Sequence, residues 1–481
     1  MGDKERGGAV FDVGEEGINA RMRECENARM RECENAKTAP KTTIMKHITI
    51  IINTLALLAI FNQPLPAQAS GKEQLAKAIL ANEAFDKVME KGNAILQTGF
   101  NAGDGYAEVW IRDLNTFITY SCRAMPQDKV REALLKFFYF QGFDGNIPDG
   151  YQEVPAGHQA DNYGTYARYD MPGFVFHKNT VETDQETSLI QAVYRYVQET
   201  GDRSILEETI RGKTVVERLE FALDYLMKHK FNEKNGLLWG GTTTDWGDVQ
   251  PYHKWGVKYD EYGIPAIDIY DNAMFLIALD NFCTLTSDKE SWAKWRAVYG
   301  SVKTNIRKHL WDEKNKKFIP HLYIQHEAFP GLNENEIFYH GGTAVAIQAG
   351  LLSKEEIRLS LKKMRQNVKA CGAQSIGLTL YPPYPAGSFA NKGMDPYSYQ
   401  NAGDWTWFGA RMITALMQNG MVEEAYQEIQ PFVNRVVKND GFFEWYTIQG
   451  EPHGSGVFRG SAGVLMEAID ALRTWAKEYR E

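Results

Sequence analysis

Apolar side chains recur at intervals of three and four residues along most of the chain, which is the spacing of one face of an α-helix. The stretch 183–201 adds end signals to this pattern, because it opens with Thr183 and Glu186 at capping-box spacing and closes on Gly201. The stretch 204–229 opens with a similar pair. The pattern predicts twelve helices, at 75–96, directly after Asp113, and at 130–141, 183–201, 204–229, 266–284, 288–310, 341–351, 353–368, 404–419, 421–437 and 457–478.

Twelve helices in consecutive pairs predict an all-α domain, in which six helical hairpins form a toroid, the (α/α)6 barrel. We place this single domain at residues 70–481. Loops rich in glycine and aromatic residues separate the pairs, at 142–182, 231–265, 371–403 and 439–456. Long loops in a compact helical domain usually carry function. In a toroid they gather at one end, where we expect them to form a cleft and to hold some short strands.

The first part of the chain differs from the rest. Residues 1–44 are charged, poor in apolar side chains and contain two copies of the unit NARMRECE. From Met45 a short polar head leads into the apolar run Ile48–Phe61, which is too short for a comfortable membrane span, and a small-residue AQA stretch follows. We interpret 45–69 as a signal peptide of a secreted or periplasmic protein and 1–44 as a doubtful upstream extension. The alternative is a disordered tail with a membrane anchor.

Composition narrows the class of protein. The formal net charge is −9, residues 1–69 carry as many basic as acidic side chains, and no basic stripe follows, so nucleic acid is not an expected partner. The five cysteines show neither a disulfide framework nor zinc spacing, and the ten histidines show no HxH or HExxH motif. We therefore expect no metal and no cofactor. We also expect a monomer, without membrane association after signal cleavage.

Four junctions between a loop and a helix concentrate polar and aromatic side chains. They hold the candidate site residues Trp110, Arg112, Asp113, Asp184, Asp245, Trp246, Asp248, Asn401, Trp405 and Glu444. Some have structural explanations, since Asp184 can favour a helix N-terminus and Asp245 and Asp248 can be turn residues. Glu444 is harder to explain in this way, because it lies among bulky apolar residues in FFEWY. An apolar setting raises the pKa of a carboxyl group, as proton transfer at neutral pH requires.

These stretches resemble motifs of the six-hairpin glycosidases, which include glucoamylases, the amylo-1,6-glucosidase part of glycogen debranching enzymes, alkaline/neutral invertases, trehalases and processing α-glucosidases. VWIRDLNTF is similar to their Trp-x-Arg-Asp motif, TDQETSLIQAVYRYVQETGD to a helix that begins with Asp and ends in Thr-Gly-Asp, and YQNAGDWTW to Tyr-x-Asn-Gly-x-x-Trp. TDWGDVQ resembles the segment that carries the general acid, and GFFEWYTIQGEP the stretch whose Glu is the general base. The resemblance runs from Tyr106 to Leu472.

The resemblance implies an inverting, exo-acting α-glycosidase whose leading substrate is an α-glucoside. By position, Asp248 is the general acid and Glu444 the general base. The sugar would be held by Trp110, Arg112, Asp113, Asp184, Asp245, Trp246, Asn401 and Trp405. Asp245 is also a rival for the acid, because relatives differ on whether the carboxylate adjoins the tryptophan. The chain departs from the pattern at Ala402, where many relatives have glycine.

Two other functions stay open. A glycoside phosphorylase of the same fold would use phosphate as its nucleophile, which needs no base, whereas Glu444 occupies the context of one. A toroid that binds sugar without catalysis is the second alternative, because fold does not establish function. The sugar and its linkage depend on the loops 142–182 and 371–403, which match no particular member of the superfamily.

The assignment of the signal peptide predicts where the mature protein begins. If translation starts at Met45 and cleavage follows Ala69, the purified native protein starts at Ser70. Mass spectrometry of the intact protein from its own cells measures this directly. Peptides from residues 1–44 in that preparation would contradict the assignment.

Overall fold

The computed structural model describes residues 71–154, 165–167, 171, 173–178, 181–254 and 259–480, which belong to one compact unit. The proposed signal peptide and upstream extension lie outside these ranges and stay predictions. Within the described ranges, no helix combines the length and the apolar character that crossing a bilayer requires.

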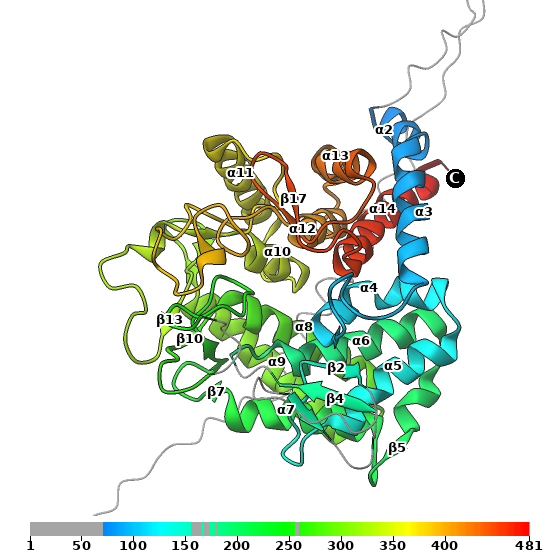
Figure 1. Cartoon of the computed structure of the whole chain (residues 1–481), viewed down its shortest axis with the longest axis vertical. Coiled ribbons are helices and arrows are strands. Elements are labelled where there is room, and N and C mark those ends of the chain that lie inside the picture. The colour runs from blue at the N-terminus through cyan, green and yellow to red at the C-terminus, as the bar shows by residue number, and fades with distance from the viewer. Residues whose placement is uncertain are drawn as a thin grey trace, which may run out of the picture. The chain divides into compact units, whose positions relative to one another are not determined.

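Six inner helices form a closed ring. Each packs against the next one, and the last returns to pack against the first (Figure 1). In ring order they are α4 (Ile111–Ala124), α6 (Asp184–Thr200), α8 (Ile269–Leu285), α10 (His340–Gln348), α12 (Thr406–Gln418) and α14 (Arg459–Arg480). Neighbours surround these helices on every side, so most positions of α8 and α10 are buried and apolar or small.

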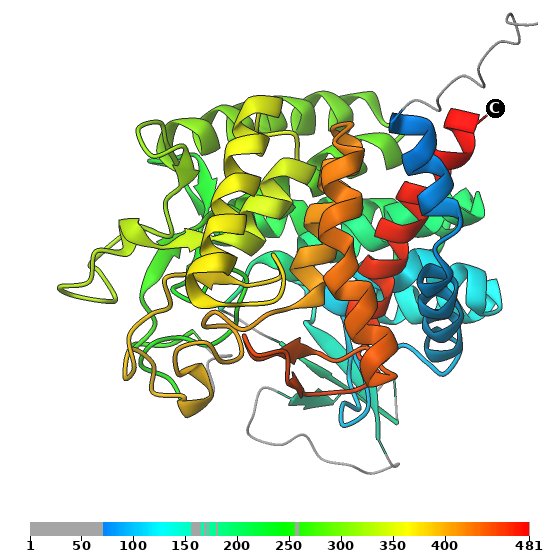
Figure 2. The ribbon, with the colours of Figure 1, turned by 90° about the horizontal axis from the view of Figure 1, so that it is seen from above.

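An outer helix precedes each inner one in the chain. The outer helices are α3 (Glu83–Leu96), α5 (Gln127–Phe140), α7 (Val215–His229), α9 (Lys289–His309), α11 (Lys354–Cys371) and α13 (Val422–Asn439). They bury one face only, as Trp295, Val302 and Ile306 do on α9, which is the amphipathic pattern of a helix on a core. The predicted (α/α)6 toroid is therefore confirmed. An additional helix, α2 (Gly71–Leu80), packs on α14, and Figure 2 shows both beside α3.

Short antiparallel strands occupy the connections. The largest sheet has the order β1-β2-β4-β3, from Val109–Trp110, Gly150–Glu153, Phe174–His177 and Thr165–Ala167. A second sheet joins β9 (Gly240–Gly241), β10 (Pro265–Ile267) and β13 (Leu322–Tyr323). Two-stranded pairs are β5 (Thr209–Ile210) with β6 (Lys213–Thr214), β7 (Phe231–Asn232) with β8 (Leu237–Leu238), β11 (Trp311–Asp312) with β12 (Lys317–Phe318), β14 (Phe338–Tyr339) with β15 (Leu380–Tyr381), and β16 (Trp445–Tyr446) with β17 (Pro452–His453).

Two predicted helices prove to be interrupted. The stretch 75–96 breaks after α2, because Asn82 accepts a hydrogen bond from the Ala84 N–H and starts α3 afresh. The stretch 204–229 contains a one-turn helix and the hairpin β5–β6 before α7 begins, and its capping box is formed by Thr214 and Glu217. The predicted box at Thr183 is also absent, since that residue makes no capping bond.

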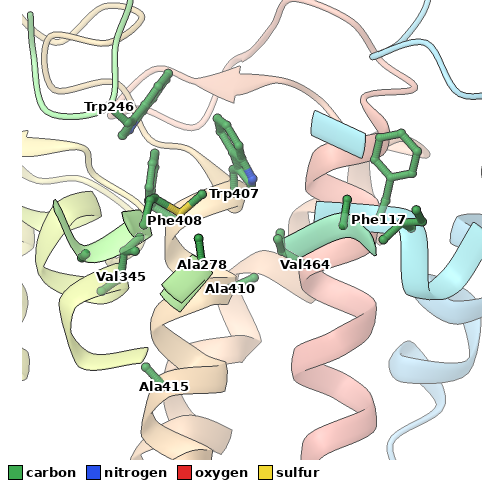
Figure 3. Close-up of a cluster of buried hydrophobic side chains, with 14 of the residues drawn as sticks. Phe117, Trp246, Ala278, Val345, Trp407, Phe408, Ala410, Ala415 and Val464 are labelled. Atoms are coloured by element: carbon green, nitrogen blue, oxygen red, sulfur yellow. The ribbon is translucent and has the colours of Figure 1, made fainter. Parts of the chain in front are cut away.

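Small side chains fill the middle of the ring, and aromatic ones close it at one end. Figure 3 shows Ala278 of α8 with Ala410 and Ala415 of α12 among the helices, and Trp407 and Trp246 at the end of the cluster. The Trp246 ring stacks on that of Phe408, with centroids 5.0 Å apart. This aromatic layer separates the packed core from the loops.

The closure of the ring depends on a close approach of α14 to α4. A Cβ atom at Gly463 would lie 2.4 Å from Phe117 Cβ and 2.5 Å from the Thr116 carbonyl oxygen. We expect Gly463→Ala to destabilise the protein by about 1–3 kcal/mol, because the two backbones would have to separate. Gly300 of α9 is the matched control, since a Cβ there meets nothing within 4 Å. Gly300→Ala should stabilise by about 0.5–1 kcal/mol. Denaturant unfolding measures both, and an unchanged midpoint for Gly463→Ala would contradict the tight closure.

Candidate active site

A cavity of about 160 Å³ lies at the N-terminal ends of the inner helices. Because an outer helix returns the chain between any two inner ones, all the inner helices run in the same direction. Their N-termini carry partial positive charge, which favours carboxylates. The cavity is lined by Ala102, Tyr106, Trp110, Arg112, Asp113, Asp149, Glu182, Trp246, Asp248, Tyr399, Gln400, Trp405, Trp407, Glu444 and Phe458.

Glu444 lies in this cavity just before β16 and is almost completely buried. The hydroxyl of Tyr106 donates a hydrogen bond to Glu444 Oε2 at 3.0 Å. Gly454 leaves room for the carboxylate, because a Cβ there would meet Oε2, and its φ of +71° also favours glycine. Burial raises the pKa of Glu444, and the negative charge of Asp248 adds to the increase, while the Tyr106 hydrogen bond opposes it.

Asp248 lines the same cavity from the loop between β9 and β10. Its side chain is half-buried, and its Oδ1 accepts a hydrogen bond from Gln400 Nε2 at 3.0 Å. The structure therefore brings Asp248 and Glu444 together, although the two residues lie in different hairpins. One carboxylate is held by a phenol and the other by an amide.

Arg112 organises a second group of carboxylates at the start of α4. Its Nη1 lies 2.6 Å from Glu182 Oε2, 3.0 Å from Asp149 Oδ1 and 3.7 Å from Asp184 Oδ1. Burial disfavours the Arg112 charge, but these carboxylates hold its pKa above the usual range. The guanidinium thus joins three chain segments at the rim of the ring.

Asp113 follows Arg112 and points into the same space. Its Oδ1 is buried and has no hydrogen-bond partner among the described residues. Burial raises the pKa of Asp113 to about 7, against the lowering effect of Arg112. An unpaired buried acceptor is unfavourable unless a ligand supplies the donor, so this oxygen is suited to a hydroxyl group.

Tryptophans form the floor of the cavity. The Trp246 ring meets Trp405 edge-on with centroids 4.7 Å apart, and Trp407 in the same way at 5.4 Å. Trp405 Nε1 donates to the Tyr399 carbonyl oxygen, whereas the indole nitrogens of Trp246 and Trp407 are buried without a partner in the described part of the chain. Trp110 lies at the wall, where its ring packs edge-on against His177.

Three of the predicted site residues do not line the cavity. Asp184 is fully buried behind Arg112, where its Oδ2 accepts a hydrogen bond from the Tyr270 hydroxyl at 3.0 Å. Asn401 is buried in its own loop and binds main-chain groups only. Asp245 lies over the start of α10, and both of its carboxylate oxygens accept from the Gly342 N–H, at 2.9 and 2.8 Å.

Sequence reasoning missed several residues of the site. Tyr106 and Gln400 bind the two central carboxylates, and Asp149 and Glu182 bind Arg112. Glu182 stands two residues before Asp184 and could have been suspected, but nothing near Asp149 signals its partner. Across the described ranges, no group of three or more His, Cys, Asp or Glu side chains is arranged to hold a metal ion.

No known protein family and no curated protein matches the sequence. Solved structures do match. The fold is similar to the GH63 mannosylglycerate hydrolase from Thermus thermophilus in complex with glucose, with a TM-score of 0.58 and 14% identity over 79% of this chain and 99% of that one. The same enzyme in complex with Tris and D-glycerate gives 0.55 and 13%, with the same coverage.

The rhamnosidase from Klebsiella oxytoca with rhamnose bound is also similar, with a TM-score of 0.52 and 14% identity over 80% of this chain. The match covers 63% of the rhamnosidase, so it spans less than two thirds of that enzyme. At these identities the likeness concerns the fold. The chain has the six-hairpin (α/α)6 toroid that these glycoside hydrolases share.

Proposed function

We propose that the protein is a glycoside hydrolase that removes a terminal α-linked sugar with inversion at the anomeric carbon. The observation that carries the proposal is the meeting of Asp248 and Glu444 in one cavity whose other walls suit a sugar. Carboxylates accept hydrogen bonds from hydroxyl groups, and indole rings cover the apolar faces of a sugar. The cavity is on the scale of one sugar ring, which supports exo-acting cleavage.

In this mechanism Asp248 transfers its proton to the glycosidic oxygen while the bond from that oxygen to the anomeric carbon breaks. The electron pair of the bond stays with the leaving oxygen. Water adds to the anomeric carbon from the opposite face, and Glu444 accepts the proton that this water loses. The products are the free sugar and the alcohol, and exchange with solvent restores both carboxyl groups.

The surroundings of the two aspartates support Asp248 over Asp245 as the acid. Asp245 uses both oxygens to accept the Gly342 N–H at the start of α10, and it does not line the cavity. Asp248 is half-buried and borders the space that a substrate would fill. We therefore propose the second aspartate of the TDWGD motif as the acid.

The charges around the cavity favour water over phosphate as the nucleophile. The described lining residues include five carboxylates and one cationic side chain, Arg112. The Nη1 atom of Arg112 already contacts Asp149 and Glu182. A phosphate dianion would be repelled there, so hydrolysis is the better candidate. We keep an α-glucoside as the leading substrate, since the motifs resemble those of families that act mostly on α-glucosides. The proposal includes export of the protein, because residues 45–69 resemble a signal peptide.

Variants of the two carboxylates test the mechanism. Asp248→Asn should reduce turnover of a natural glycoside by about 10²–10⁴-fold, and much less for a glycosyl fluoride, which needs little protonation. Glu444→Gln should be severe for both substrates, because the water still lacks its base. Steady-state kinetics after a screen of α-linked gluco-, manno- and galacto-disaccharides, with detection of the product anomer, measures these effects.

Asp245→Asn is the matched control for this experiment. The amide oxygen of Asn can still accept from the Gly342 N–H, so we expect the fold to persist and any loss of activity to be the same fraction for both substrates. A leaving-group-dependent loss in Asp245→Asn would transfer the acid role to Asp245. Near-wild-type activity of Glu444→Gln would defeat the proposed mechanism. No hydrolysis by the wild-type protein would defeat the proposed activity and leave a sugar-binding toroid.

The hydrogen bond from Tyr106 predicts a change in pH dependence. A base must be ionised, so kcat/KM falls as pH drops through the pKa of Glu444, which burial already raises. Tyr106→Phe removes a donor that favours the ionised form and therefore raises this pKa further. The acidic limb of the kcat/KM profile should shift to higher pH. Tyr323→Phe, which removes a phenol bound to Glu334 outside the cavity, should leave the limb in place.

A further inference from the structure

We propose that Gln400 positions the general acid: its amide N–H holds Asp248 Oδ1, which leaves Oδ2 to carry the transferred proton, and its amide oxygen receives a hydroxyl group of the substrate. The inference rests on the proposed function and deepens it. It gives a specific task to a residue that no sequence motif singled out.

The contacts of Gln400 carry the first half of this inference. Gln400 Nε2 donates to Asp248 Oδ1 at 3.0 Å, and the side chain lines the cavity although it is only 2% exposed. An amide N–H can donate to Oδ1 whether the carboxyl group is ionised or carries its proton on Oδ2. The hydrogen bond therefore persists through proton transfer and determines which oxygen faces the glycosidic bond.

The amide oxygen of Gln400 supports the second half of the inference, the contact with a substrate hydroxyl group. Gln400 Oε1 is buried and has no hydrogen-bond partner among the described residues. It lies beside Asp248 and against Gly247, where a Cβ would approach Oε1 to 2.3 Å. Glycine at this position thus preserves the place of the amide. A substrate hydroxyl would satisfy the unpaired oxygen, which links sugar binding to the orientation of the acid.

The backbone around Gln400 supports a positioning role. Tyr397, Tyr399 and Ala402 have φ values of +66°, +46° and +69°, a region that residues other than glycine rarely adopt. Thr379 Oγ1 holds this conformation on both sides, because it donates to the Gln400 carbonyl oxygen and accepts from the Ala402 N–H, both at 2.9 Å. Such strain persists only where surrounding contacts enforce it, and it is common at functional sites.

The side chain of Asn401 also stabilises this loop. Its Oδ1 accepts from the Tyr384 N–H at 2.8 Å, and its Nδ2 donates to the carbonyl oxygens of Tyr384 and Met394 at 3.0 and 2.9 Å. The side chain thus makes three hydrogen bonds to the main chain of earlier residues in the loop 371–403. The adjacent Gln400 is held with little freedom to turn away from Asp248.

Two substitutions separate the two halves of the inference. Gln400→Met keeps the length of the side chain and removes both amide groups. Gln400→Glu keeps an acceptor and replaces the N–H donor by a carboxyl group that competes with Asp248 for one proton. Both should lower kcat/KM for a natural glycoside by about 10–100-fold, with a clearly smaller loss for the glycosyl fluoride. KM should rise in Gln400→Met and stay near the wild-type value in Gln400→Glu.

The control is Gln348→Met. It removes a partly buried amide of α10 that is hydrogen-bonded to Arg411 of α12. It should leave both kinetic constants unchanged, and thermal unfolding should confirm that every variant is folded. Equal losses for both leaving groups in a folded Gln400→Glu protein would overturn the positioning role. An unchanged KM in Gln400→Met would overturn the substrate contact.

The outcome also distinguishes failure of this inference from failure of the proposed function. If Asp248→Asn shows the leaving-group dependence and the Gln400 variants do not, only the role of Gln400 is wrong. If Asp248→Asn shows none, the acid itself is misassigned, and the positioning role fails with it.

Discussion

One buried cation, Arg112, joins the acidic parts of the ring. Its Nη1 connects α4 to Asp149, directly before β2, to Glu182, before α6, and to Asp184 in the first turn of α6. Carboxylates buried at this density would repel one another and lose hydration, and removing the partner of a buried ion pair costs several kcal/mol. The wall of the cavity, and with it the position of Asp113, depends on this pairing.

The environments of the acidic groups differ even though the groups share one end of the toroid. Asp245 and Asp184 are fully enclosed by protein, and burial raises the pKa of each to about 7. Glu444 is also buried, yet it keeps a phenol donor and one face toward the cavity. Asp248 is the most open of the four. Burial therefore separates two carboxylates enclosed by protein, Asp184 and Asp245, from two that border the cavity, Asp248 and Glu444.

Most helices could be predicted because they repeat an apolar face over many residues, as the outer helix α9 does. The prediction was wrong where a short break interrupts a stretch with helical apolar spacing. Asn82 starts a new helix, and Arg211 and Gly212, with positive φ angles, form the turn of the hairpin β5–β6. The location of the site, at four junctions between a loop and a helix, could be predicted from the sequence. The roles of Asp149, Gln400 and Asp245 were not, because each depends on a partner far away in the sequence.

The closure of α14 on α4 has a consequence for the order of folding. The hairpin α13–α14 is the last to be synthesised, and the segment within it carries Glu444, while Tyr106 and Arg112 come from the first hairpin. Contacts between such distant segments form late, because the loop between them must first be closed at an entropic cost. The loop that carries Asp248 can therefore fold before Glu444 reaches the cavity. The two carboxylates meet only when α14 closes on α4.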